Sequence, residues 1–276
     1  MSNNKPLNRE DYEEPNCPFC VDNFQSKKPV KSIDTNRMIS KLDEFLDRDD
    51  FDSAQRLLDY WLNEAKLGND LRGELTIQNE LMGLNRKCQN RERAESAVKR
   101  GLELVKELGL EGTVTSATTY LNAGTVYNSF DEPKLSLDYY KKAQAIYENS
   151  NVDKYKLGGL YNNMSLVYGK LGEYREAKEL INKAISLMKE IGNKLEEAIS
   201  YLNLVDILNA ESQDDQVLQE IEEYLDISEK LLNSDVERDL YYAYVCDKCI
   251  PSFDYYGRFG FAEELRKRVT KIYEGH

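Results

Sequence analysis

Histidine is almost absent from this chain of 276 residues, because the only one is the last residue, His276. Without an internal imidazole the chain has no histidine general base, no serine–histidine triad and no histidine-rich metal site. Neither glycine-rich phosphate loop, G-x-x-x-x-G-K-[ST] or G-x-G-x-x-G, occurs. The 50 carboxylates are spread along expected helix surfaces instead of gathering into acid–base pairs. We therefore expect a protein that is not an enzyme and that uses no cofactor.

Long apolar runs are also missing, and the opening residues MSNNKPLNREDYEEPN lack the layout of a signal peptide. These two absences predict a cytoplasmic protein that does not span a membrane. The formal net charge of −13 at pH 7 repels nucleic-acid phosphates, and no basic patch is concentrated enough to overcome it. The sequence therefore excludes nucleic acid and membrane as expected partners.

A repeat of about 41 residues is the strongest feature that is present. Tyr120 and Tyr161 are 41 residues apart, and Asn122, Asn163 and Asn203 follow at steps of 41 and 40. Within each unit, apolar residues recur at three- and four-residue spacing on both sides of a turn rich in Gly, Asp or Asn. Periods of this size signal stacked helix pairs. The sequence thus predicts an all-α solenoid of about six antiparallel helix hairpins, spanning 34–68, 70–109, 112–149, 153–192, 194–233 and 236–274.

The division of the chain follows from this register. Residues 34–276 are expected to form the helical repeat domain. Residues 1–33 contain four prolines and no periodic pattern, which predicts an irregular N-terminal arm that docks on the first hairpin or into the groove of the repeat domain. At the other end, a cluster of tyrosines and phenylalanines surrounds Pro251, which should end or kink its helix. This cluster is interpreted as a packed end cap or, alternatively, a ligand pocket.

The clearest copy of the repeat has the motif Tyr161-x-x-Met164-Ser165-x-x-Tyr168-x-x-x-Gly172-x-Tyr174-x-x-Ala177, followed by Ala184. This motif resembles a tetratricopeptide repeat, and the preceding unit has similar residues at matching places. The resemblance implies a right-handed superhelix. Its long period is similar to that of kinesin light chains and of bacterial peptide-sensing regulators. The whole chain also resembles uncharacterised tetratricopeptide proteins of Firmicutes, which implies a bacterial source.

The first helix of each hairpin lines the concave surface in such an array. Positions i, i+4, i+7 and i+11 of these helices then form a stripe of mostly small and polar side chains. One register of the stripe, which we call the ladder, consists of Glu80, Asn122, Asn163 and Asn203. An asparagine amide both donates and accepts, so spaced asparagines suit the backbone of an extended peptide. The resemblance to kinesin light chains implies this use for the three asparagines. Alternatively, the amides bond to neighbouring helices or to water.

The expected function is therefore a protein- or peptide-binding adaptor. Its candidate groove residues are Asn122, Asn163, Asn203, Glu80, Thr118, Thr125, Arg86, Lys87 and Lys170. The three cations are candidates for holding an acidic C-terminus. Two alternatives stay open: a peptide-responsive regulator of an effector protein, and a scaffold switched by zinc or redox chemistry. Apolar repeat ends also allow a homodimer.

The zinc and redox alternative depends on two C-x-x-C pairs, Cys17 with Cys20 and Cys246 with Cys249. Two such pairs can build a tetrahedral zinc site. However, 226 residues separate Cys20 from Cys246, which is far outside the usual spacing of zinc ribbons. Cys246 and Cys249 also fall at inward positions of the last hairpin, so we expect both to be buried as small hydrophobic residues. No metal site is predicted, and the four cysteines are kept as an alternative.

Overall fold

The computed structural model describes residues 31–275, and in this range every regular element is an α-helix. Twelve helices form six antiparallel hairpins: α1 (Thr35–Leu46) with α2 (Phe51–Gly68), α3 (Leu71–Lys87) with α4 (Arg91–Glu107), α5 (Val114–Ser129) with α6 (Pro133–Tyr147), α7 (Lys154–Lys170) with α8 (Tyr174–Glu190), α9 (Lys194–Glu211) with α10 (Asp215–Leu232), and α11 (Leu240–Tyr255) with α12 (Phe259–Glu274). All twelve lie inside the six predicted ranges, so the predicted all-α array of hairpins is confirmed. Only the last three residues of the predicted arm, 31–33, fall within the described residues.

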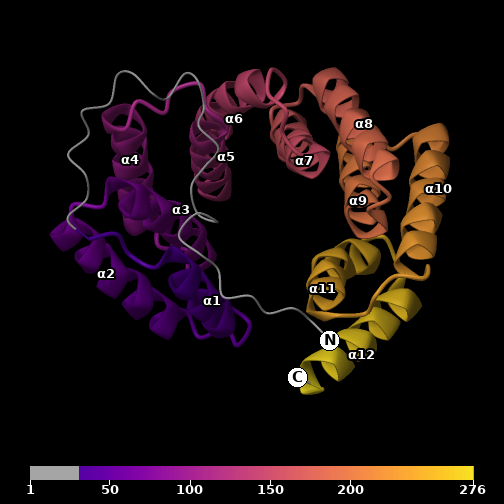
Figure 1. Ribbon diagram of the computed structural model, residues 1–276. Helices are drawn as coiled ribbons and strands as arrows, with labels where there is room; N and C mark the ends of the chain where they lie inside the picture. The colour runs from indigo at the N-terminus through magenta and orange to yellow at the C-terminus, as the bar shows by residue number, and fades with distance from the viewer. Residues whose placement is uncertain (1–30, 276) are drawn as a thin grey trace.

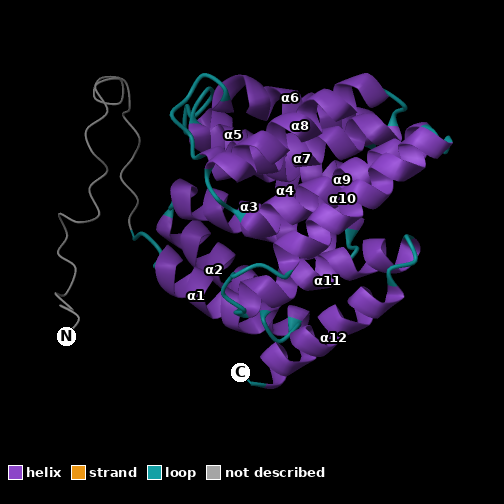
Figure 2. Cartoon of the chain, turned by 90° about the vertical axis from the view of Figure 1, so that its right-hand side faces the viewer, coloured by secondary structure: helices purple, strands orange, loops and turns teal. Residues whose placement is uncertain are grey.

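The hairpins stack side by side into a curved array (Figure 1). The first helix of each hairpin faces the inside of the curve, and the second helix lies outside. The side view shows that all the hairpins belong to one continuous stack (Figure 2). None of the helices between residues 35 and 274 combines the length and the apolar character needed to cross a bilayer.

Local sequence signals explain where the helices begin. Nine helices are preceded by a residue whose side chain accepts a hydrogen bond from a backbone N–H of the first turn. This bond satisfies a donor that the helix itself leaves unpaired. These caps are Asp34, Asp50, Asp70, Asn90, Thr113, Asp153, Asn193, Asp214 and Asp239. Helix α6 instead begins with Pro133, whose fixed φ and missing N–H suit the first helical position.

Glycines at the ends of α2, α4 and α8 are required for two different reasons. Gly109 and Gly192 follow α4 and α8 with φ of 61° and 70°, a left-handed conformation that glycine adopts without steric cost. Gly68 is the last residue of α2, and here Asn69 takes the left-handed position with φ of 54°. A Cβ on Gly68 would lie 2.1 Å from the carbonyl oxygen of Lys31. At that position, glycine lets the residues before α1 pack against the end of α2.

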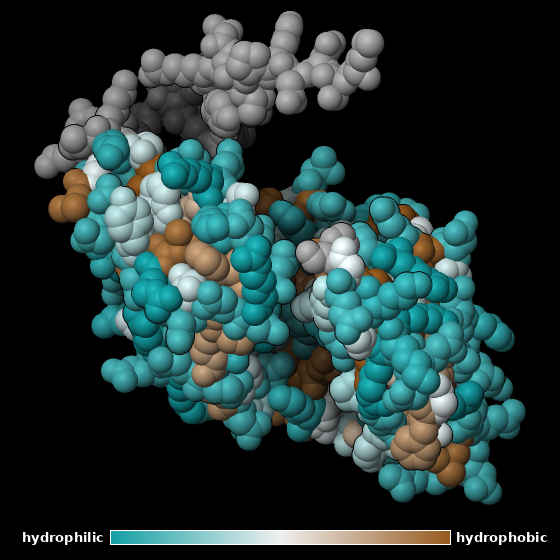
Figure 3. Space-filling view, turned by 90° about the horizontal axis from the view of Figure 1, so that it is seen from below, coloured by the Kyte–Doolittle hydropathy of each residue, from teal (hydrophilic) through white to brown (hydrophobic). Residues whose placement is uncertain are grey.

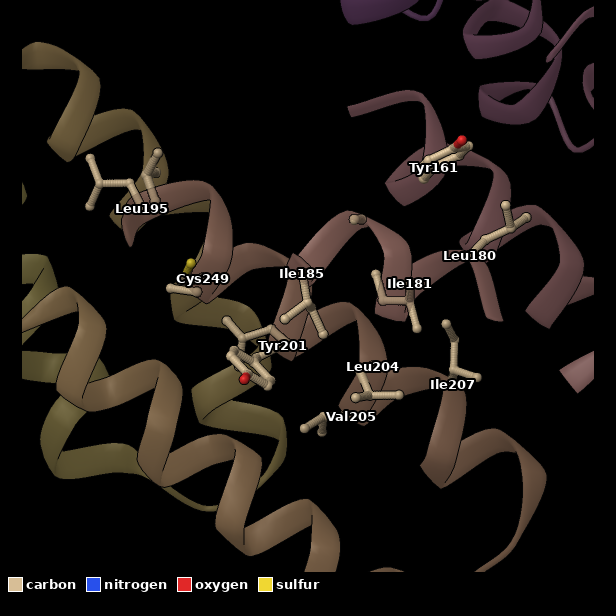
Figure 4. Close-up of a cluster of buried hydrophobic side chains, with 14 of the residues drawn as sticks. Tyr161, Leu180, Ile181, Ile185, Leu195, Tyr201, Leu204, Val205, Ile207 and Cys249 are labelled. Carbon is tan, nitrogen blue, oxygen red and sulfur yellow. The ribbon is translucent and has the colours of Figure 1, made fainter. Parts of the chain in front are cut away.

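The core lies between the helices of each hairpin and between successive hairpins. The residues of the clearest repeat copy are buried as predicted: Tyr161, Met164, Tyr168, Ala177 and Ala184. Figure 4 shows Ile181 and Ile185 of α8 turned toward the α9 side chains Leu204, Val205 and Ile207. Small residues set the close approach of helices elsewhere. A Cβ on Gly124 of α5, for example, would lie 2.5 Å from the fully buried ring of Tyr140 on α6.

The last hairpin departs from the regular pattern. Helix α11 packs on α9, while the turn before α12 reaches α10 through Arg258, which pairs with Glu222 at 2.6 Å and Asp226 at 2.8 Å. Pro251 was expected to end or kink its helix. It does not end the helix, because α11 continues to Tyr255, and the kink stays a prediction.

The aromatic residues of this hairpin divide into two groups. Tyr242, Phe253 and Phe261 are buried and form the predicted end cap, and the rings of Phe253 and Phe261 meet edge to face at 4.8 Å. Tyr241 and Tyr244 are exposed. The cap interpretation therefore holds for only part of the cluster, and the exposed members are available to line a binding surface.

Candidate functional site

The inner surface of the array is hollowed where α7, α9 and α11 meet. The hollow has a volume of about 400 Å³, within the range of small-ligand sites. Its lining combines apolar side chains with a few polar ones: Tyr155, Gly159, Asn162, Asn163, Leu166, Glu196, Ile199, Leu202, Asn203, Lys248, Cys249 and Ser252. Seen from below, the molecule shows a deep hollow between two lobes, with apolar residues inside it (Figure 3). Two of the three ladder asparagines thus lie together in one concave site.

Two ladder asparagines are tied to neighbouring hairpins. Nδ2 of Asn122 on α5 donates to Oδ1 of Asn79 on α3 at 2.9 Å. Nδ2 of Asn203 on α9 donates to Oδ1 of Asn162 on α7 at 3.1 Å. The amide N–H groups of Asn122 and Asn203 therefore bond to adjacent helices, which was the alternative to binding a peptide. Each tie still leaves the oxygen and one N–H of the ladder amide for other partners.

The acceptors of these ties, Asn79 and Asn162, were not among the predicted site residues. Both precede a ladder position by one residue, and they are 83 residues apart, which is two repeats. Asn162 is buried, and its Nδ2 donates to Oγ of Ser200 at 2.8 Å. The sequence therefore contained a signal for these two acceptors, namely two asparagines separated by two repeat periods.

Asn163 differs from the other two ladder asparagines. Among residues 31–275 its half-buried amide has no hydrogen-bonding partner. The residue on α5 that corresponds to Asn79 and Asn162 is Leu121, which has no side-chain acceptor. Its amide atoms are therefore reached by solvent and not by other described side chains, so Asn163 is the ladder asparagine that keeps all its hydrogen-bonding groups for another molecule.

Glu80, the first member of the ladder, is half-buried and forms no ion pair with the described residues. Burial raises the pKa of its carboxyl group above the ordinary value of 4.5, and the negative charge of Asp43 on α1 raises that pKa further. This end of the concave surface therefore carries an uncompensated negative charge.

The two threonines of the stripe bond within their own hairpin. Thr118 Oγ1 donates to the carbonyl of Val114 and lies 3.0 Å from the hydroxyl of Tyr147. Thr125 Oγ1 donates to the carbonyl of Leu121 and lies 3.1 Å from the hydroxyl of Tyr140. Both threonines thus connect α5 with α6, so each has a structural role in addition to any contact with a guest.

The three predicted cations are not gathered into one cluster. Lys170 on α7 donates to Oδ1 of Asn128 on α5 at 2.9 Å and so bridges two hairpins. Arg86 and Lys87 lie at the end of α3, where Arg86 is half-buried and Lys87 is exposed. The structure instead brings Lys248 of α11 into the hollow. No sequence signal identified Lys248, because its place depends on how the irregular last hairpin docks.

Two tyrosines of α11, Tyr241 and Tyr244, contact the charged side chains that line the hollow, Glu196 and Lys248. The hydroxyl of Tyr241 donates to Glu196, and the rings of Tyr241 and Tyr244 are stacked 6.4 Å apart. Nζ of Lys248 lies 4.4 Å from the centre of the Tyr244 ring, a cation–π contact. Burial first, and the contact with Glu196 second, raise the pKa of Tyr241 well above its ordinary value. The phenol therefore stays a hydrogen-bond donor at neutral pH.

The two cysteines of α11 are buried, whereas Cys88 at the end of α3 is exposed. Cys246 and Cys249 are buried as predicted. Burial raises the pKa of the Cys246 thiol to about 11 and that of Cys249 above its ordinary value. Between residues 31 and 275 no three histidine, cysteine or carboxylate side chains converge as metal ligands would. Cys17 and Cys20 lie outside the described residues.

A family model described as "Tetratricopeptide repeat" matches residues 159–190, which hold α8 and most of α7. The α7–α8 hairpin is thus similar to a tetratricopeptide repeat. The array of six hairpins has a tetratricopeptide-like fold, and it is similar to solved structures that share little sequence with this chain. A Rap protein in complex with Competence and Sporulation Factor has a TM-score of 0.60 and 18% identity, over 86% of this chain and 63% of that one.

Two further structures show the same likeness to the tetratricopeptide-like array. A putative kinesin light chain from Podosopora anserina, with nearly identical repeats, has a TM-score of 0.52 and 13% identity, over 72% of this chain and 94% of that one. BtubC from P. vanneervenii has a TM-score of 0.50 and 16% identity, over 88% and 92%. No curated protein matches this sequence. At these identities the structures show the fold alone.

Proposed function

We propose that this tetratricopeptide-like protein is a peptide-binding adaptor that holds an extended segment of a partner against its concave surface. The observation that carries the proposal is Asn163, a half-buried amide without a described partner, in a hollow that it shares with Asn203. An amide in this position can donate to and accept from one peptide unit whatever the side chains of the guest are. Leu166, Ile199 and Leu202 supply apolar contact area.

The inner surface suits a peptide better than a small apolar ligand. Its polar groups recur along successive helices, as the backbone of an extended guest requires. The complex of a Rap protein with Competence and Sporulation Factor supports this proposal, because that protein has a similar fold and is bound to a factor. The same complex favours a second candidate function, a regulator whose affinity for an effector protein changes when a signal peptide binds in the groove.

The test is retention of a random-sequence nonapeptide pool by the purified protein, measured by mass spectrometry. Asn163→Ala should reduce retention about tenfold, because it removes hydrogen bonds from a partly desolvated site. Asn182→Ala is the matched control: Asn182 is an exposed asparagine on α8 whose amide donates to its own helix. A pool that binds Asn163→Ala as well as the parent protein, or that binds neither protein, would contradict the groove proposal.

A further inference from the structure

The hairpin of α1 and α2 forms one end of the curved array, and within the described residues no hairpin precedes it (Figure 1). Nη2 of Arg93 on α4 donates to both carboxylate oxygens of Asp59 on α2, at 2.9 and 3.0 Å, so this side of α2 is turned toward the second hairpin. The side turned away carries residues at i, i+3, i+4, i+7 and i+10, which share one helix face. We call these residues the end face: Leu57, Tyr60, Trp61, Glu64 and Leu67.

The end face is apolar and partly uncovered. Tyr60 is 57% exposed and Leu67 is 73% exposed, although both are large apolar side chains. Leu57 and Trp61 are half-buried, and the rings of Tyr60 and Trp61 meet edge to face at 5.6 Å. Four large apolar side chains gathered on one helix face are typical of a surface that packs against another segment.

The chain itself leads onto this face. The backbone N–H of Lys31 donates to the carbonyl oxygen of Gly68 at 3.3 Å, and the ammonium group of Lys31 lies 3.8 Å from the carboxylate of Glu64. Gly68 is one turn beyond Glu64 on the same side of α2, and its missing side chain leaves room for Lys31. Both of these partners belong to α2, which is an outer helix. The N-terminal arm therefore joins the array beside the end face and not at the concave surface.

The arm has the length and the side chains to cover the end face. Seven residues separate Lys31 from Phe24, and they span up to about 24 Å when extended. From Gly68 back to Leu57, α2 rises only about 16 Å. The segment 19–24, with the sequence FCVDNF, contains two phenylalanines and a valine, whose burial against an apolar face is favourable.

We propose that residues 19–24 of the arm dock on the end face and cap the N-terminal end of the array. The docked segment withdraws Trp61 and its neighbours from water, and the burial of apolar surface stabilises this arrangement. Because the segment occupies the end of the stack, a second copy of the chain does not dock through the same face. This inference concerns a different surface from the proposed function and stands without it.

Trp61 is the only tryptophan of the chain, so its fluorescence reports on the end face alone. In the full-length protein, the double substitution Phe19→Ser and Phe24→Ser should shift the Trp61 emission to longer wavelength. It should also increase quenching of that emission by acrylamide, because water and quencher reach an uncovered indole ring. Leu7→Ser is the matched control, since Leu7 is an apolar residue of the arm outside the segment, and it should change neither quantity. Circular dichroism should be the same for all these proteins, because every substitution precedes α1.

A substitution on the end face itself gives a second measurement. Leu67→Lys places a charge at an exposed position of α2 and should increase acrylamide quenching as the arm variant does. Leu218→Lys is its matched control, because Leu218 is an exposed leucine on α10, and it should leave the quenching unchanged. Emission and quenching that stay the same in the double arm variant would overturn the inference. An emission that depends on protein concentration, equally in the parent protein and in the double arm variant, would show that a second copy covers the end face and would also overturn it.

Discussion

Asn203 is tied to a neighbouring hairpin, whereas Asn163 is not. A double-mutant cycle at Asn162 and Asn203 tests this difference. In the structure these side chains share a hydrogen bond of 3.1 Å between α7 and α9. The perturbation is Asn162→Ala and Asn203→Ala, singly and together. The matched control pair is Leu121 and Asn163, the corresponding positions on α5 and α7, which share no hydrogen bond.

The magnitudes follow from the contacts of each residue. Asn203→Ala removes one inter-hairpin hydrogen bond and should cost about 1 kcal/mol of unfolding free energy. Asn162→Ala also loses the bond to Ser200, leaves a small cavity at a buried position and should cost about 2–3 kcal/mol. If the tie is real, the double variant should cost about 1 kcal/mol less than the sum of the two. Asn163→Ala should cost less than about 0.5 kcal/mol.

The assay is urea unfolding followed by far-ultraviolet circular dichroism, with all variants at the same pH and ionic strength. A coupling energy below about 0.3 kcal/mol at Asn162 and Asn203 would refute the inter-hairpin tie. An equally large coupling in the control pair would show that neighbouring positions of this array couple without an amide tie. Either result would remove the reason for singling out Asn163.

Three further predictions concern the fold and its charges. Gly124→Ala should lower the free energy of unfolding by about 1–3 kcal/mol, because the added Cβ would meet a buried tyrosine ring. Gly83→Ala should raise the free energy of unfolding by about 0.5–1 kcal/mol in the same urea titration, because no neighbouring atom lies within 4 Å of its Cβ position. The folded state holds the proton of Glu80 more tightly than the unfolded state does, because its pKa is raised above 4.5. Glu80→Gln should therefore stabilise the fold at neutral pH and lose that advantage as the pH falls through the raised pKa of the folded state toward 4.5, as urea titrations at several pH values would show. Peptide mapping after brief alkylation should find Cys88 modified before Cys249, because Cys88 is exposed whereas Cys249 is buried with a raised pKa; equal rates in the folded protein would contradict the packing of α11.

Charge and cysteine arguments from the sequence had unequal outcomes. The burial of Cys246 and Cys249 was predictable, since it requires only the apolar face of one helix. The groove cations were not, because Lys170 is engaged by Asn128 and the cation that enters the hollow is Lys248. Whether a charged side chain takes part in a site depends on the residues that pack around it. When those residues belong to other hairpins, the sequence alone does not identify them.

What the sequence determined by itself is the architecture. Helix starts such as Asp70 and Asn193 and the left-handed turns at Gly109 and Gly192 act within a few residues, and the 41-residue period repeats them. Local signals of this kind can be read without coordinates. They gave all twelve helices and the side of each hairpin that faces inward.

Only the tertiary structure decided which ladder asparagine is available to a guest. That depends on whether the preceding first helix presents an acceptor, as Asn79 and Asn162 do, or an apolar side chain, as Leu121 does. Residues about 40 positions apart meet only after the hairpins have stacked, and a hydrogen bond requires their atoms to lie within about 3 Å of one another. The repeat places equivalent residues in register, whereas the contacts between hairpins determine which of them keep their hydrogen-bonding groups for another molecule.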